Sequence, residues 1–385
     1  MKTETFPAHY VEKVALKRGI PPRVVPEPWR DSVTGSAQKG TPMSTAIVPT
    51  PAFVAGLPKA ELHLHLEGTL EPELKLELAR RNGVDIGQST VEQVRATYEF
   101  DSLASFLGVY YPAMNVLVTE ADFYDLGTAY FRRAAADGVR RVEAFFDPQA
   151  HTSRGVPIET VILGYHRAAV DAAALGVSAE LILCFLRDFS AESALETLTS
   201  ALPYKDRFIG VGLDSDEREN PPAKFAAVFA LARENGLKLT MHCDIDQVGS
   251  IENIRQVLEE IQVDRIDHGT NIVENPELVT LVRERGLGLT CCPVSNSFVT
   301  ADMKAVEMVA LLNFGVLVTV NSDDPAYFGA YVADNYLALA EKAGLDTDEL
   351  VLLAKNSFQA SWLPDAEKQA YLESIDRYVA GYPTT

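Results

Sequence analysis

The chain has 385 residues, of which 47% are hydrophobic and 23% charged, a composition typical of a soluble globular protein. Its formal net charge of −20 disfavours binding to nucleic-acid backbones or to anionic membranes, so we expect neither as a partner. We expect a cytoplasmic protein, because no apolar run could cross a bilayer, the first residues lack a signal-peptide layout, and the four cysteines form no disulfide framework.

The first part of the chain differs in composition from the rest. Residues 1–50 are rich in Pro, Gly, Ser and Thr and show no periodicity, which predicts an irregular N-terminal arm. We expect residues 51–385 to form a single catalytic domain.

Strand-like and helical segments then alternate along this domain. Amphipathic stretches such as 221–236, 250–262 and 275–286 separate the strand-like runs, and residues 71–137 hold more than one helix, which partly covers the site. The pattern predicts a (β/α)₈ TIM barrel with extra helices after strand 1 and at the C-terminus. An open doubly wound sheet would carry a Gly-rich phosphate turn after its first strand, where this chain has only Gly68. The eight strand-like runs are 59–68, 138–147, 177–186, 207–215, 237–244, 264–269, 286–292 and 315–324.

Polar side chains gather at the ends of these runs, where barrel enzymes place their catalytic groups. His63 and His65 are two residues apart on a strand, so both are expected to face the lumen. Imidazoles buried there need a use for their lone pairs, and a metal ion is the simplest one. His242 can supply a third nitrogen and Asp323 an oxygen, a set that suits zinc, although iron or manganese would also fit.

Each part of this pattern also has a purely structural interpretation. An isolated His-x-His pair is more often a hydrogen-bonded pair than a metal site, and only the combination with the other strand-end groups favours a metal. We interpret Cys243, Cys291 and Cys292 as packing residues. The remaining histidines, His9, His151 and His166, receive no catalytic role.

Three motifs together resemble the adenosine/adenine deaminase family of the amidohydrolase superfamily. They are the segment from His63 to Gly68 (HLHLEG), the segment from Arg265 to Gly269 (RIDHG) and the segment from Asn321 to Pro325 (NSDDP). The likeness runs from about Lys59 to Leu363 and is strongest to the adenine deaminase branch.

This resemblance implies a role for each matching residue. His63, His65, His242 and Asp323 match the ligands of one Zn²⁺ ion per chain. His268 matches the residue that orients and helps deprotonate the attacking water, and Asp324 the residue that contacts purine N7. Asp214 and Ser215 lie where the family touches the far edge of the purine. At the position of Glu67, adenosine deaminases usually carry an Asp that holds the ribose. A Glu at this position is similar to what an enzyme that acts on free bases would have.

One departure from the family concerns the proton donor. The family has a glutamate three residues after the ligand of the fifth strand, in a His-Ala-Gly-Glu motif, and here that position is Ile245. Three interpretations stay open: Asp244 or Asp246 replaces the glutamate, the substrate needs no proton there, or the chain binds a purine without converting it.

We therefore expect a zinc-dependent hydrolytic deaminase of adenine or a related aminopurine that acts on a small-molecule purine and releases ammonia. The alternatives are a metal-dependent hydrolase of an N6-substituted purine or another heterocycle, and a non-catalytic purine-binding protein. The sequence leaves open whether the chain forms a homo-oligomer.

Overall fold

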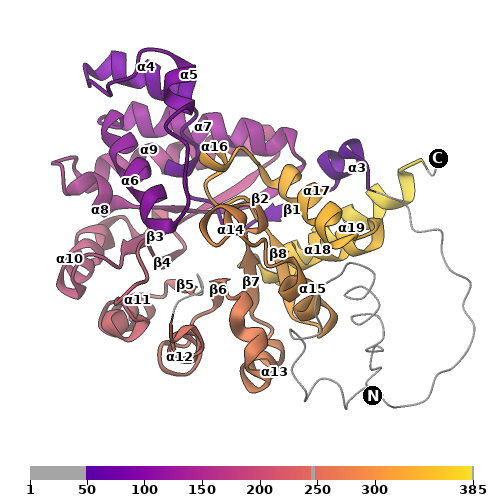
Figure 1. The fold of residues 1–385 in the computed structure, drawn as a ribbon. Coiled ribbons are helices and arrows are strands. Elements are labelled where there is room, and N and C mark those ends of the chain that lie inside the picture. The colour runs from indigo at the N-terminus through magenta and orange to yellow at the C-terminus, as the bar shows by residue number, and fades with distance from the viewer. Residues whose placement is uncertain (1–48, 244–247, 384–385) are drawn as a thin grey trace, which may run out of the picture.

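The computed structural model describes residues 49–243 and 248–383, and eight strands form one sheet within them. The strands follow each other around the sheet in sequence order, and every neighbouring pair is parallel. Helices lie around the strands, which confirms the predicted (β/α)₈ barrel (Figure 1). The strands are β1 (Lys59–Glu61), β2 (Val139–Phe146), β3 (Ser178–Leu186), β4 (Gly210–Asp214), β5 (Lys238–Cys243), β6 (Arg265–His268), β7 (Gly288–Cys291) and β8 (Leu317–Val320).

The barrel closes between β8 and β1 just beyond the ends of these two strands. The amide N–H of His65 donates to the carbonyl oxygen of Asp323 at 3.0 Å, and the N–H of Asp323 donates to the carbonyl of His63 at 3.1 Å. Below them, the N–H of Leu62 donates to the side-chain oxygen of Asn321 at 2.8 Å. The backbone of the predicted metal ligands is therefore also the seam that closes the sheet.

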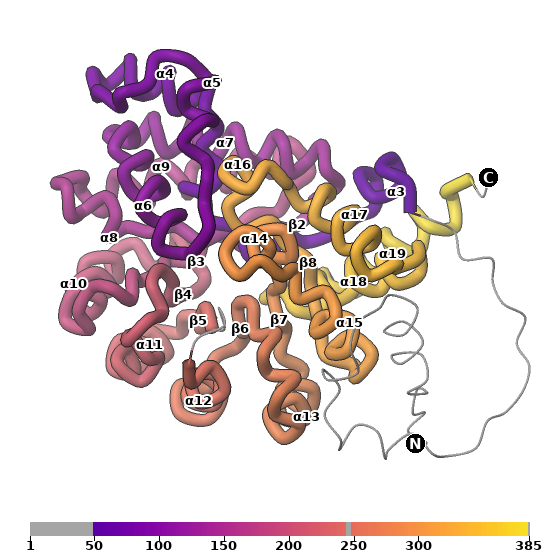
Figure 2. The backbone as a smooth tube through the Cα atoms, viewed as in Figure 1, coloured from indigo at the N-terminus to yellow at the C-terminus, as the bar shows by residue number. Residues whose placement is uncertain are grey.

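The helices between strands form the outer layer of the barrel, and extra helices follow β1 and end the chain. The ribbon and the tube, drawn from the same side, show α6 and α14 in front of the strands (Figures 1 and 2), and residues of both helices line one cavity with residues from the strand ends. The α-helices are α3 (Pro51–Gly56), α4 (Pro72–Asn82), α5 (Val91–Arg95), α6 (Leu103–Ala113), α7 (Glu120–Ala136), α8 (Pro148–Thr152), α9 (Ile158–Asp171), α10 (Ala191–Ala201), α11 (Ala226–Glu234), α12 (Ser250–Arg255), α13 (Pro276–Arg285), α14 (Pro293–Val299), α15 (Ala305–Asn313), α16 (Pro325–Phe328), α17 (Val332–Ala343), α18 (Thr347–Ala360) and α19 (Asp365–Gly381). The shorter turns are η2 (Glu67–Thr69), η3 (Met114–Val116), η4 (Ala172–Leu175), η5 (Leu202–Arg207), η6 (Pro222–Phe225), the π-helical η7 (Gln256–Ile261) and η8 (Thr270–Glu274).

Local sequence signals explain where these helices begin and end. In α13, the side chain of Asn275 accepts hydrogen bonds from the N–H groups of Glu277 and Leu278, and the helix ends at Gly286, whose φ of 63° few other residues adopt. The expected helix over 250–262 is present as α12 followed by η7. One continuous hydrophobic core packs the helices against the outer face of the sheet.

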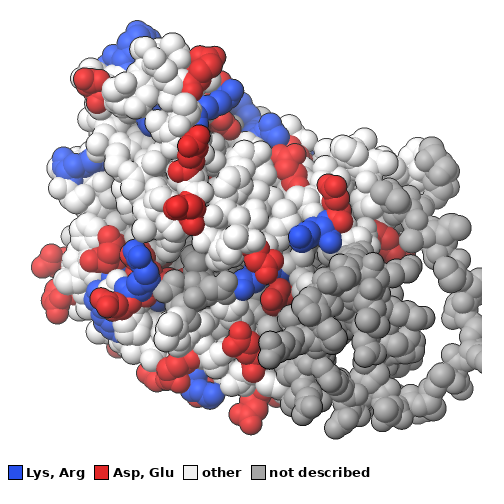
Figure 3. Space-filling model, viewed as in Figure 1, with Lys and Arg blue, Asp and Glu red and all other residues white. Residues whose placement is uncertain are grey.

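Two findings bear on the predicted surroundings of the protein. No helix among the described residues is both long and apolar enough to span a membrane. On the face shown in Figure 3, acidic and basic side chains are interspersed.

The predicted N-terminal arm, residues 1–50, lies almost wholly outside the described residues, so it stays a prediction.

Candidate active site

Three histidines and one aspartate meet at the end of the barrel that α6 and α14 cover. Nε2 of His63 lies 3.2 Å from Oδ1 of Asp323, and Nε2 of His65 lies 3.5 Å from the same oxygen. Nε2 of His65 is also 3.1 Å from Nε2 of His242. All four side chains are buried, and their ligand atoms lie within 4.8 Å of one another. The structure thus brings together the whole predicted ligand set.

These distances fit a tetrahedral metal site. A zinc ion with bonds of about 2.1 Å to nitrogen and oxygen places its ligand atoms about 3.4 Å apart along each edge of the tetrahedron. Nε2 of His65 and Nε2 of His242 lie 3.1 Å apart and can share at most one proton between them. A cation bound to both nitrogens would satisfy both lone pairs. The donor set of three imidazoles and one carboxylate therefore fits a divalent cation.

The protonation of two of the three imidazoles suits metal binding, because a histidine ligand must be neutral. Burial lowers the pKa of His65 to about 4, and burial together with His63 lowers the pKa of His242 well below its usual value. Burial opposes charge on both His63 and Asp323, but their contact outweighs it, so the pKa of His63 is raised and that of Asp323 is lowered.

Polar groups behind the ligands fix their orientation. Nδ1 of His63 donates to the carbonyl oxygen of Thr290 at 3.1 Å, which leaves the lone pair on Nε2 free. The hydroxyl of Ser295 donates to Oδ2 of Asp323 at 2.6 Å, so Oδ1 remains for the cluster. The guanidinium of Arg187 donates to the carbonyl of His242 at 2.6 Å and holds the end of β5. Such contacts are what set the position of metal ligands.

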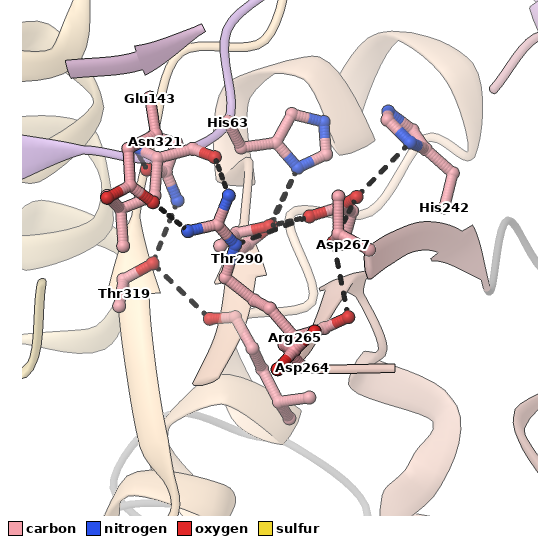
Figure 4. A network of polar contacts seen from close by, with 12 residues as sticks. His63, Glu143, His242, Asp264, Arg265, Asp267, Thr290, Thr319 and Asn321 are labelled. Atoms are coloured by element: carbon pink, nitrogen blue, oxygen red, sulfur yellow. Dashed lines mark hydrogen bonds and ion pairs between the residues drawn. The ribbon is translucent and has the colours of Figure 1, made fainter. Parts of the chain in front are cut away.

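Asp267 connects the supports of two ligands, as Figure 4 shows. Its carboxylate accepts hydrogen bonds from the hydroxyls of Thr240 at 2.7 Å and Thr290 at 2.9 Å. The same carboxylate lies 3.5 Å from Nδ1 of His242, while Thr290 contacts His63. One buried carboxylate on β6 therefore orients His242 directly and His63 through Thr290.

His268 stands beside the cluster at the end of β6. Its ring centroid is 4.6 Å from that of His63, and burial lowers its pKa to about 3, so the ring is neutral at pH 7. The backbone φ values of Ser215, His268 and Asp323 are 74°, 62° and 64°, a left-handed conformation that is uncommon for residues other than glycine. Such backbone strain is often found at functional sites, and here it turns three strand ends toward one cavity.

A cavity of about 50 Å³ lies against the cluster and has two kinds of wall. Its polar wall includes His65, Asp147, Asp214 and Asp324. Burial and the neighbouring acids raise the pKa of Asp147 and Asp324 well above the ordinary value, and burial raises that of Asp214 to about 7. The apolar wall comes from α6 and its neighbours, with Leu103, Phe106, Leu107, Val299 and Phe328.

The extra helix α6 therefore covers the site, as expected for the long segment after the first strand. Its aromatic side chains Tyr110 and Tyr111 also line the cavity. Gly68 packs against Asp324, because a Cβ on this residue would lie 2.7 Å from the Cα of Asp324. Gly68, which directly follows the first predicted strand-like run, thus leaves room for Asp324, the second aspartate of the SDDP segment.

The structure places some of the other predicted site residues in the cavity lining and others elsewhere. Ser215 lines the cavity, whereas Asp244 and Asp246 lie outside the described residues. Glu67 is fully buried and does not itself line the cavity, and its Oε1 is 2.9 Å from Nε2 of His151. Its role toward substrate stays a prediction.

Sequence reasoning missed several residues of the site. Asp147 carries a signal that could have found it, because it stands between a strand end and a proline as Asp324 does. Thr290 and Ser295 carry no such signal, because their roles depend on which strands become neighbours.

Comparisons with known proteins identify the family of the chain. The adenosine deaminase family model matches residues 58–378, so the chain belongs to this family. An adenine deaminase from Sphingopyxis alaskensis is 52% identical over 330 residues, which is 85% of this chain and 96% of that protein. An uncharacterized deaminase from Schizosaccharomyces pombe is 48% identical over 332 residues, 86% of this chain and 98% of that one. The protein is accordingly a deaminase, an enzyme that hydrolyses a carbon–nitrogen bond.

Two solved structures resemble the whole barrel. The crystal structure of an adenine deaminase from Arthrobacter aurescens has a TM-score of 0.81 and 43% identity, and the match covers 84% of this chain and all of that one. An amidohydrolase from Burkholderia ambifaria with bound zinc has a TM-score of 0.78 and 26% identity, and the match covers 90% of this chain and 97% of that one.

Proposed function

We propose that the protein is a zinc-dependent deaminase that hydrolyses adenine to hypoxanthine and ammonia. The observation that carries this proposal is the convergence of His63, His65, His242 and Asp323 beside a small buried cavity lined by carboxyl groups. Relatives named adenine deaminase that are about 50% identical along most of the chain support the choice of adenine. A cytoplasmic location and a homo-oligomeric state stay predictions.

The ligand set would hold one Zn²⁺ ion, which in such sites lowers the pKa of water to about 7 and so supplies a nucleophile at neutral pH. His268, a neutral imidazole beside His63, would accept a proton from the attacking water and orient it toward the ring carbon that bears the amino group. Asp324 would hold the purine at N7, and Asp214 with Ser215 would contact its far edge. The apolar side chains of α6 would exclude bulk water from the reacting atoms.

The mechanism also needs a proton donor to the ring nitrogen next to the attacked carbon. We propose Asp244 or Asp246, because each follows His242 closely and Ile245 cannot transfer a proton. Asp244→Asn or Asp246→Asn should abolish deamination while bound zinc stays near one ion per chain. Full activity in both variants would exclude this assignment.

A spectroscopic screen tests the proposed activity. The purified protein with one equivalent of zinc is incubated with adenine, adenosine, N6-methyladenine, guanine and a pterin, and the ultraviolet spectrum and released amine are followed. We expect the highest kcat/KM with adenine, with one ammonia per hypoxanthine formed. Faster turnover of N6-methyladenine would instead assign an N6-substituted purine, and binding of adenine without any spectral change over hours would show a non-catalytic protein.

A further inference from the structure

Asp147 and Asp324 occupy equivalent positions in two different βα units. Each follows the end of a strand, each precedes a proline that begins a short helix, and their φ/ψ values are −110°/80° and −119°/71°. An aspartate at this position ordinarily caps its helix by accepting a hydrogen bond from a first-turn N–H. Neither side chain does so here, and both line the cavity instead.

The carboxyl group of Asp147 is held in place but has an unused oxygen. Its backbone N–H donates to Oε1 of Glu67 at 3.3 Å, and the residue is 1% exposed. Oδ1 of Asp147 and both carboxyl oxygens of Asp214 make no well-formed hydrogen bond among the described residues, although the two carboxyl groups face each other and Asp214 also lies near the thiol of Cys184. Buried polar atoms without partners are costly, so this pair is suited to a ligand that brings hydrogen-bond donors.

The position of the pair relative to the metal ligands defines which part of a purine it would meet. The imidazole of His65 has Nε2 in the metal cluster, and its Nδ1 lies 3.4 Å from Oδ2 of Asp214. Asp214 therefore lies on the side of the His65 ring that faces away from the metal cluster. One ligand atom each of His65, Asp147 and Asp214 lie within 4.8 Å of one another, so Asp147 stands beside Asp214 there. If C6 of a purine is held at the cluster and N7 at Asp324, the opposite N3–N9 edge faces this pair.

We propose that Asp147, together with Asp214, accepts a hydrogen bond from the N9–H group of the free base and thereby selects bases over nucleosides. A free purine base has a donor at this edge, whereas a nucleoside has a glycosidic carbon there that can neither donate nor fit beside two buried carboxyls. A site built to pair with one polar group rejects analogues that lack it much more strongly than an apolar pocket would. This inference rests on the proposed function for the orientation of the ring.

The test compares ligands that differ only at N9. Dissociation constants for hypoxanthine and 9-methylhypoxanthine are measured by calorimetry on the zinc-loaded protein, together with kcat/KM for adenine and 9-methyladenine. The variants are Asp147→Asn, which preserves side-chain size, and Asp147→Ala. The control is Asp188→Asn, an exposed carboxylate close enough to influence Asp214 electrostatically.

We expect the native protein to prefer hypoxanthine, and both Asp147 variants to lose this preference by about 10- to 100-fold while binding of the 9-methyl compound changes little. Asp188→Asn should keep the native preference. Equal losses of affinity for both ligands in Asp147→Asn, with unchanged thermal stability, would overturn the proposal. A second zinc ion that the native protein binds and this variant loses would also overturn it, because Asp147, Asp214 and His65 would then form a cation site. Absence of adenine turnover in the native protein would refute the proposed function, and the calorimetric comparison would still decide the role of Asp147.

Discussion

Asp267 shows how much of the site depends on residues that never touch the substrate. It lies behind the ligands, is fully buried, and contacts Thr240, Thr290 and His242 through one carboxylate. Because the same group orients two imidazoles, we expect its loss to alter the affinity for metal before it alters the fold.

The substitution Asp267→Asn tests this expectation. An amide in this place must turn its NH₂ group toward a threonine hydroxyl or His242, so the imidazole loses its charged partner. We expect zinc affinity to fall about 10- to 100-fold, measured by competition with a chelator of known affinity. The control Asp264→Asn removes a carboxylate that pairs with Lys238 at the other end of β6 and should leave the affinity unchanged. Equal affinities in the two variants would contradict this role of Asp267.

At the scale of elements, one buried ionic network joins strands across the inside of the barrel. Glu143 on β2 accepts hydrogen bonds from Arg265 on β6 and from Arg141, and it accepts one from the backbone N–H of Trp362 at 2.8 Å. The guanidinium of Arg265 also lies 4.2 Å from the centre of the Trp362 ring. The network, part of which Figure 4 shows, stands directly below the metal ligands and ties the segment after α18 to the barrel.

Removing the acid from this network should destabilise the fold. Glu143→Gln removes the nearest counter-charge of the buried Arg265, which then keeps, among the described residues, only Asp267 at 3.9 Å. Removal of one partner costs about 3–5 kcal/mol of unfolding free energy in comparable buried pairs. Urea unfolding followed by circular dichroism measures the loss. The matched control is Glu180→Gln, which changes the half-exposed register partner of Glu143 on β3 and should cost less than about 0.5 kcal/mol. A similar small loss in both variants would show that the buried charge is not needed.

The sequence predicts elements better than it predicts their contacts. Alternating apolar runs and helix-ending glycines such as Gly286 located all eight strands, since these signals are local. The strand-end histidines were found because barrel geometry sends every strand end to one face. The contacts of Thr290 with His63 and of Ser295 with Asp323 could not be predicted, because they depend on side-chain directions in segments more than 25 residues apart.

At the scale of the whole molecule, three residues close the barrel with their backbones and form the candidate metal cluster with their side chains. The backbones of His63, His65 and Asp323 join β1 to β8, while their side chains form the cluster. A bound cation would therefore stabilise the folded chain as well as supply the chemistry, since any ligand that binds only the native state shifts unfolding.

The most direct test is a titration of metal-free protein with zinc. Adenine deamination, bound zinc and the thermal midpoint of unfolding are measured at each addition. We expect activity to rise in proportion to bound zinc and to level off at one ion per chain, with the midpoint rising in parallel. Full deamination activity in protein shown by elemental analysis to contain no metal would contradict the central claim.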